Sequence, residues 1–215
     1  MSATPATELL RSGLLEGVSL LLARAGDDAG AQPGSLADAV RACATGLGAR
    51  VLEALPIAPG SARAIEEVEL EAQLDSTLAA AASVDMLVVD AAGMYAAAAL
   101  GACLEASWNV TRALANRAFL APTRPGRIVY LAPAPAAGEH AEAARAGLEN
   151  LARTLSIEWA RHDVTAVAIS PGDHIPPGEV AALVAYLASP AGSYFSGCLL
   201  DLRGTPAATS AVSPW

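Results

Sequence analysis

Short apolar runs alternate with segments of helical periodicity along this chain, and this alternation most limits the folds it can adopt. Apolar runs that predict strands lie at 17–23, 48–52, 86–89, 126–131, 164–169 and 197–202. Helical spacing predicts helices over 36–47, 94–119, 139–160 and 178–188. Strands that alternate with helices are typical of a parallel, doubly wound sheet, and uninterrupted apolar runs fit strands buried on both faces. We therefore expect a three-layer α/β fold built on a doubly wound parallel sheet.

Local signals refine this prediction. Ser35 is placed to cap the first predicted helix, since a serine oxygen accepts the free N–H groups at a helix start. Charged and apolar residues alternate over 66–71, which predicts a short half-exposed strand, and Asp75 is expected to cap a helix through residue 82. We expect one domain over residues 1–205 and a loose tail over 206–215, which is small and polar.

Composition excludes several classes of protein. Hydrophobic residues make up 53% of the 215 residues and charged residues 16%, which excludes a disordered chain. No apolar run reaches the roughly 18 residues that a membrane helix needs. A net charge of −9 and only 4% aromatic residues argue against nucleic-acid binding. Without a basic leader, and with three scattered cysteines, the chain is expected in the cytoplasm, bound to neither membrane nor nucleic acid.

All 13 basic residues are arginines, so the chain has no lysine. This excludes Schiff-base chemistry, a P-loop, and any dehydrogenase mechanism that needs a lysine beside a tyrosine. Loss of lysine by drift in a GC-rich genome is an alternative cause, but the chemical consequence is the same.

From about residue 84 onward, six segments occur in an order and at spacings that resemble the short-chain dehydrogenase/reductase family. They are 85–93 (DMLVVDAAG), 108–113 (WNVTRA), 126–133 (GRIVYLAP), 145–160 (RAGLENLARTLSIEWA), 164–172 and 179–197. The first third resembles the family only in topology. The resemblance implies a Rossmann fold and a relationship to oxidoreductases that use NAD or NADP.

The family's catalytic residues are missing at the matching positions. Ala141 stands where the family has its acid–base tyrosine, and Arg145 stands where it has the lysine that lowers the tyrosine pKa and holds the ribose. Pro133 replaces the serine, Cys103 falls near the asparagine of the proton relay, and Asp90 replaces the asparagine of the Asn-Ala-Ala-Gly motif. We therefore expect no catalytic residue.

The family's glycine-rich cofactor loop is also altered. In the matching stretch 23–30, Arg24 and Asp28 occupy the first two glycine positions, and only Gly30 is kept. Side chains there hinder the close backbone approach that a diphosphate needs, and adjacent carboxylates repel it. We expect neither a cofactor nor a metal. The segments 52–85 and 173–177 are shorter than in the family, so a lid over the substrate is also expected to be missing.

A few other side chains are candidates for acid–base, nucleophilic or metal chemistry, and each also has a simpler structural interpretation. His140 is a candidate displaced acid–base group, but an exposed histidine at a helix start is the simpler interpretation. A hydrolase triad could be assembled from Ser170, Asp173 and His174, but their closeness in sequence does not give triad geometry and the chain has no nucleophile elbow. As metal ligands, Asp173 and His174 lack partners at a useful spacing. Cys103 as a nucleophile competes with a buried helix cysteine, which is far commoner.

The segments that keep the family pattern best are those that build its subunit interfaces. Our candidate interface residues are Trp108, Leu148, Leu151, Leu155, Trp159 and Tyr194. Packing of these side chains in the chain's own core is the alternative for each. The sequence therefore predicts a non-catalytic, family-like subunit that oligomerises with an active short-chain dehydrogenase/reductase or with itself. The alternatives are an NAD(P)-dependent oxidoreductase with a rearranged site, with Arg145 holding the ribose, and a small-molecule binding module in the old cofactor cleft.

Overall fold

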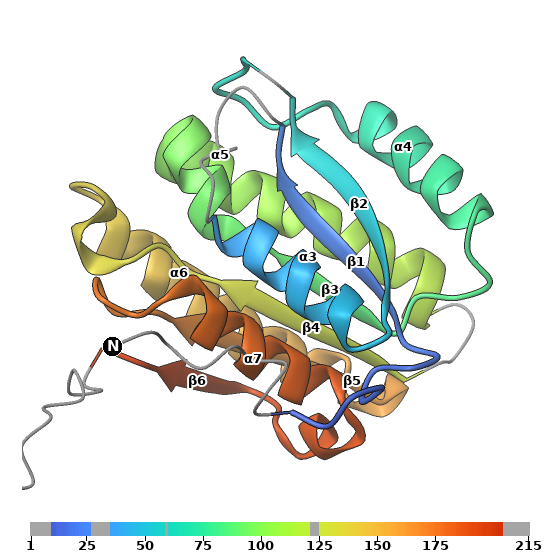
Figure 1. Cartoon of the computed structure of the whole chain (residues 1–215). Helices are drawn as coiled ribbons and strands as arrows, with labels where there is room; N and C mark the ends of the chain where they lie inside the picture. Colours follow the sequence, from blue (N-terminus) through green and yellow to red (C-terminus); the bar gives the residue numbers. More distant parts are fainter. Residues whose placement is uncertain (1–9, 27–34, 59, 121–124, 204–215) are drawn as a thin grey trace, which may run out of the picture.

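A six-stranded parallel sheet forms the centre of the molecule, as predicted (Figure 1). The computed structural model describes residues 10–26, 35–58, 60–120 and 125–203. The strands are β1 (Ser19–Ala25), β2 (Arg50–Ile57), β3 (Met86–Val89), β4 (Gly126–Leu131), β5 (Val164–Ser170) and β6 (Cys198–Asp201), in the spatial order β2-β1-β3-β4-β5-β6. The order reverses between β1 and β3, and ligands of doubly wound folds bind at the carboxyl ends of the strands near such a reversal.

Helices cover both faces of the sheet and make the fold three-layered (Figure 1). On one face lie α3 (Leu36–Gly46) and α7 (Pro177–Ala188), and on the other α4 (Glu67–Ala79), α5 (Ala91–Ala115) and α6 (Ala141–Glu158). Four short helices complete the described chain: η1 (Asn116–Leu120), η2 (Pro135–Ala137), η3 (Ala160–His162) and η4 (Pro190–Tyr194). Neighbouring strand residues enter opposite layers: Leu21 packs under α4–α6, whereas Leu20 and Leu22 pack under α3 and α7.

The largest error of the sequence prediction concerns residues 66–82. No strand forms at 66–71 and Asp75 does not cap a helix, because one helix, α4, runs from Glu67 to Ala79. Leu70 and Leu74, one turn apart, are buried, while Val68 is 78% exposed. The four-residue spacing of the two leucines therefore decides the structure, although the local alternation of charged and apolar residues matches a strand.

Most other boundaries agree with the prediction. The Ser35 hydroxyl accepts a hydrogen bond from the Asp38 N–H at 3.1 Å and caps α3 as expected. The segments 27–34 and 204–215, which include part of the cofactor loop and the predicted loose tail, lie outside the described residues. No described helix combines the length and the apolar character needed to cross a membrane.

Helix α5 contains a strained alanine, because Ala99 has φ 62° and ψ −172°. That region of backbone space suits glycine and costs another residue about 1–3 kcal/mol. The Ala99 side chain is exposed, so replacing it with glycine removes no buried contact. We expect Ala99→Gly to raise the free energy of unfolding by about 1 kcal/mol in urea denaturation.

Ala96→Gly is the matched control, because Ala96 is exposed in the regular part of the same helix. Glycine there should destabilise the protein by about 1 kcal/mol. Equal losses in both variants would contradict the strain at Ala99.

Candidate functional site

A buried carboxyl group lies where the sheet order reverses. Asp90 follows β3, its N–H donates to the Ala23 carbonyl of β1 at 2.8 Å, and its Oδ1 accepts from the Gly93 N–H at 3.1 Å. This bond makes Asp90 the N-cap of α5. Burial raises the pKa of Asp90 to about 6, against smaller opposing effects of the Gly93 N–H and the Arg24 charge.

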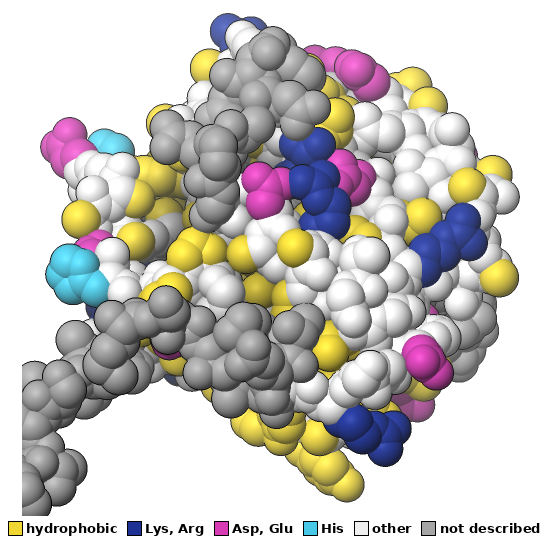
Figure 2. Space-filling view, in the orientation of Figure 1, with side chains coloured by type: hydrophobic (Ala, Val, Ile, Leu, Met, Phe, Trp, Pro, Cys, Tyr) yellow, Lys and Arg dark blue, Asp and Glu magenta, His cyan; other side chains and the backbone are white. Residues whose placement is uncertain are grey.

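Arg24, at the first glycine position of the family loop, is held by a charged network. Its Nε and Nη2 lie 3.0 and 2.9 Å from Oε2 of Glu53 in the middle of β2, and its Nη1 donates to the Ala25 carbonyl at 3.1 Å. Glu53 also binds Arg41 of α3 at 2.8 Å, and Arg41 pairs with Asp38. Figure 2 shows basic and acidic side chains gathered on this face of the molecule. Arg24 is thus engaged with the protein's own carboxylate.

Arg145, which the resemblance matches to the family's lysine, holds two loops together as a clamp. Its Nη1 donates to the carbonyl of Pro133, after β4, at 2.6 Å and to that of Pro171, after β5, at 2.9 Å. The residue is only 4% exposed. Its Nη2 is buried and has no hydrogen-bond partner among the described residues.

Charged residues from the last strand extend this clamp. Glu142 lies 3.5 Å from Nε of Arg145 and 3.3 Å from Nη1 of Arg203. Burial is the main cause that lowers the pKa of Arg145, and the Glu142 carboxylate opposes this shift. Arg203 donates to both oxygens of Asp201 from its side chain and lowers the pKa of Asp201 to about 2. The segment that follows β6 is thereby tied to α6.

The phenol of Tyr95 lies beside the start of α6, close to Ala141, which the resemblance matches to the family's tyrosine. Ala141 is fully buried, and the N–H of His140 donates to the hydroxyl of Tyr95 on α5 at 3.2 Å. A Cβ on Gly138 would lie only 2.8 Å from that hydroxyl, so Tyr95 fills the space in front of the first turn of α6. The sequence analysis missed Tyr95. Its signal is its position two residues after the Asp-Ala-Ala-Gly segment that ends at Gly93.

The loops that follow β4 and β5 are also joined directly. The Ala136 N–H donates to Oδ1 of Asp173 at 2.8 Å. Asp173 therefore serves a structural contact, and no hydrogen bond joins it to Ser170 or His174 among the described residues. Ser170 is buried and His174 is exposed, so the structure does not bring Ser170, Asp173 and His174 together as a triad.

Cys103 is a buried helix cysteine. Its thiol donates to the Ala91 carbonyl at 3.3 Å, and burial raises its pKa to about 12. A thiol with that pKa carries almost no thiolate at neutral pH and is a poor nucleophile. His140 lies exposed at the start of α6. Within the described residues no group of three His, Cys, Asp or Glu side chains is placed to hold a metal.

The candidate interface residues divide into two groups. Leu148 and Leu155 are fully buried in the chain's own core and are not accessible to a partner. Trp108 is 38% exposed and Tyr194 89% exposed, while Leu151 and Trp159 are half-buried at the margin of the core. Ile157, which the sequence analysis did not single out, is 78% exposed on α6.

Comparison with solved structures identifies the architecture. A short-chain dehydrogenase from Mycobacterium smegmatis is similar over 96% of this chain and 99% of its own, with a TM-score of 0.73 and 22% identity. The citronellol catabolism dehydrogenase of Pseudomonas aeruginosa gives a TM-score of 0.71 at 20% identity, covering 92% of this chain and 98% of its own. The chain has the fold of the short-chain dehydrogenases.

A third structure extends the same comparison. The 3-ketoacyl-(acyl-carrier-protein) reductase of Brucella melitensis, complexed with NADH, matches 88% of this chain and 98% of its own at 19% identity and a TM-score of 0.65. No protein-family model matches the sequence, and no curated protein matches it. At these identities the likeness concerns the fold.

This fold implies a nicotinamide dinucleotide, but the described residues do not fit one. The buried carboxyl of Asp90 lies at the reversal of strand order, where a diphosphate carries further negative charge. Arg24 carries a side chain where a glycine would allow close backbone approach, and that side chain is bound to Glu53. Arg145 donates to two backbone carbonyls of its own chain. We derive no reaction step through the cofactor.

Proposed function

We propose that the chain is a non-catalytic subunit that oligomerises with an active short-chain dehydrogenase/reductase and supports it. One observation carries this proposal: the loops after β4 and β5, between which substrate would enter, are joined to each other. The joining contacts are the Arg145 bonds to Pro133 and Pro171 and the bond from Ala136 to Asp173. A site tied together in this way stabilises the subunit instead of admitting a substrate.

The residues near this closure also lack an acid–base pair. Catalysis by a phenol needs a tyrosine within hydrogen-bond reach of substrate and a neighbouring cation that lowers its pKa. The Tyr95 hydroxyl accepts a backbone N–H and packs on Gly138, so it belongs to the wall of the closed site. The Nη1 group of Arg145 donates to the carbonyls of Pro133 and Pro171. Both groups support a structural use of the old site.

The outer surface of α5 and α6 offers the face for the partner. The two helices pack side by side, with Leu104 against Gly147. Trp108, Ile157 and Trp159 leave apolar surface uncovered on them. An active relative of the same fold presents matching helices, and a closed symmetric pairing buries such surfaces. We therefore assign this face to an active short-chain dehydrogenase.

Co-expression tests the pairing. The chain is produced with a short-chain dehydrogenase from the same genome that keeps the tyrosine and lysine, and the complex is weighed by size-exclusion chromatography with light scattering. We expect a hetero-oligomer whose dehydrogenase unfolds at a higher temperature than it does alone. Ile157→Glu should weaken the complex at least about tenfold, since it buries an unpaired charge.

Val68→Glu is the matched control, because Val68 on α4 is 78% exposed, as is Ile157, but lies outside the proposed face. It should leave the complex intact. A stable homo-oligomer that ignores such dehydrogenases would overturn the proposal.

A second candidate is supported by the unpaired Nη2 of Arg145. A buried guanidinium nitrogen without an acceptor is the group that a ribose hydroxyl, or another small ligand in the old cleft, would satisfy. This candidate predicts that NADH or NADPH stabilises the protein, by about 2.7 kcal/mol at 100 times the dissociation constant. We expect no shift in thermal unfolding at millimolar cofactor. A clear shift that disappears in Arg145→Met would favour the second candidate.

A further inference from the structure

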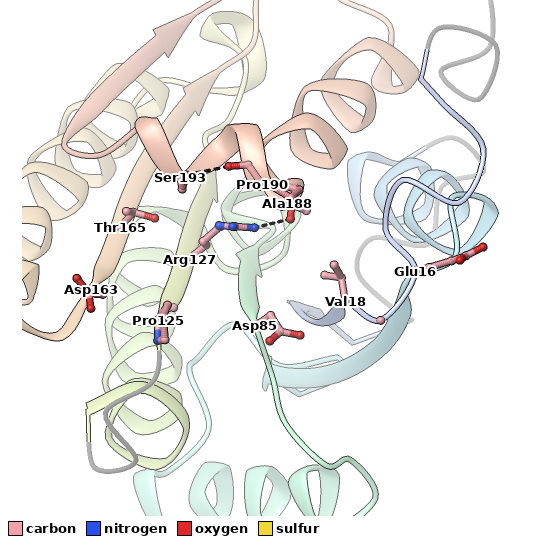
Figure 3. A pocket seen from close by; sticks show the side chains of 12 residues that line it. Glu16, Val18, Asp85, Pro125, Arg127, Asp163, Thr165, Ala188, Pro190 and Ser193 are labelled. Atoms are coloured by element: carbon pink, nitrogen blue, oxygen red, sulfur yellow. Dashed lines mark hydrogen bonds between the residues drawn. The ribbon is translucent and has the colours of Figure 1, made fainter.

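A cavity of about 400 Å³ lies at the amino end of the sheet, opposite the site described above (Figure 3). It is bounded by residues at or just before the starts of β1, β3, β4 and β5 and by the end of α7, with Val18, Asp85, Arg127, Thr165 and Ala188 in its wall. Its volume falls within the range of small-molecule sites, which is about 300–1,000 Å³. None of the chemistry considered above uses it.

Arg127, the second residue of β4, is the central charged group of this cavity (Figure 3). Its Nη1 donates to the carbonyl of Ala188, the last residue of α7, which fixes the direction of the side chain. Its Nε and Nη2 make no hydrogen bond to any described residue. The guanidinium is half-buried, and burial lowers its pKa while the Asp85 charge opposes this shift. Arginine stays protonated in proteins, so a cation with free donors faces the cavity.

Negative groups lie around this cation. Asp85 contributes a carboxylate, which accepts the Ser19 N–H at 2.8 Å, and Asp163 contributes a second, whereas the Glu16 side chain points away from Arg127 (Figure 3). The remaining wall includes apolar side chains, among them Val18 and Pro125. Among the described residues, the cavity therefore combines the guanidinium of Arg127, the carboxylates of Asp85 and Asp163 and an apolar surface.

We propose that this cavity binds a small zwitterion of the α-amino acid class. A carboxylate matches the free Nε–Nη2 edge of Arg127, since guanidinium groups bind carboxylates through two parallel hydrogen bonds. An anion alone would face the carboxylates of Asp85 and Asp163, and a cation alone would leave the guanidinium without an acceptor. A zwitterion meets both signs of charge, and the apolar wall favours an aliphatic side chain. The inference does not depend on the role proposed for the carboxyl end of the sheet.

Binding is tested with a matched set of probes on the full chain. The standard amino acids are screened by thermal shift, with leucine as the first probe, and dissociation constants are measured by calorimetry. Leucine is compared with 4-methylpentanoic acid, which lacks the ammonium group, and with 3-methylbutylamine, which lacks the carboxylate. We expect a zwitterion to bind, and each single-charge analogue to bind at least about tenfold more weakly. The proposal is overturned if no amino acid binds, or if an analogue binds as tightly as its parent.

Two variants assign the binding to this cavity. Arg127→Gln should weaken binding at least about tenfold, because a neutral amide cannot replace the charged pair. Arg127 also contacts the end of α7, so a second variant, Asp163→Asn, separates binding from stability. Asp163 is exposed at the cavity, and its substitution should weaken binding of the amino acid but not binding of 4-methylpentanoic acid. Arg153→Gln, an exposed arginine on α6 paired with Glu149, is the control and should change nothing. Unchanged binding in both cavity variants would overturn the assignment.

Discussion

Arg145→Ala is expected to lower the free energy of unfolding by about 3 kcal/mol. The substitution removes two hydrogen bonds from a buried cation to the carbonyls of Pro133 and Pro171. Each charged hydrogen bond is worth about 1.5–3 kcal/mol, and each carbonyl left buried without a donor costs about 1–3 kcal/mol. Burial of the charged guanidinium, which lowers the pKa of Arg145, costs the parent protein some free energy. Removing the charge recovers that cost, so the net loss is smaller than the sum of the lost hydrogen bonds. Equilibrium denaturation in urea measures the net loss.

Two companion variants separate the clamp from general effects of losing an arginine. Arg145→Lys keeps the charge and three donors and should lose only about 1 kcal/mol. Arg153→Ala removes an arginine whose side chain is 60% exposed and should stay within about 0.5 kcal/mol of the parent. A loss at Arg145 no larger than that at Arg153 would contradict the clamp.

Asp90→Asn is expected to stabilise the protein at neutral pH by about 2 kcal/mol, with the gain vanishing in acid. Burial raises the folded-state pKa of Asp90 from 3.8 to about 6, so the folded protein binds the proton more tightly than the unfolded chain. The parent therefore loses stability as pH rises from 3.8 to about 6, and the full penalty is present above that window. Asparagine has no charge to bury and caps a helix as well as aspartate.

The attraction between a carboxylate and the start of α5 opposes this gain. It is worth about 0.3–1 kcal/mol, less than the burial penalty, so the gain survives. Denaturation curves at pH values on either side of the window measure the difference. Asp75→Asn is the control, since its hydrogen bond with Arg117 lowers the pKa of Asp75 and the substitution should not stabilise the protein at neutral pH. Parallel pH profiles for the parent and Asp90→Asn would contradict the burial of charge.

Strands β3 and β4 could be predicted from sequence because nearly all of their side chains are buried. The apolar runs at 86–89 and 126–131 coincide with β3 and β4, whose buried side chains leave no competing pattern. The first part of helix α4 was predicted as a strand because its outward face carries Val68 between glutamates, a pattern that also matches a strand. Its burial depends on Leu70 and Leu74 meeting a sheet that is distant in sequence.

The resemblance predicts which family residues are replaced at the candidate site, but it could not predict the contacts that the residues of this chain make there. Ala141, Arg145 and Pro133 are visible in an alignment to a known motif. The acceptors of Arg145 are backbone carbonyls from two other loops, and carbonyls carry no sequence signal. Tyr95 reaches α6 from a helix 45 residues earlier, so only the fold brings the two together.

Enzymes give up stability where they work, because strained backbone and polar groups without partners are needed for catalysis. In this protein the same region contributes to stability through a buried cation that bridges two loops and a carboxylate that joins them again. Under the proposed role, a partner would bind a preformed surface, and association would order little of this chain. These contacts favour stability in this region, which is the property that the proposed supporting role requires.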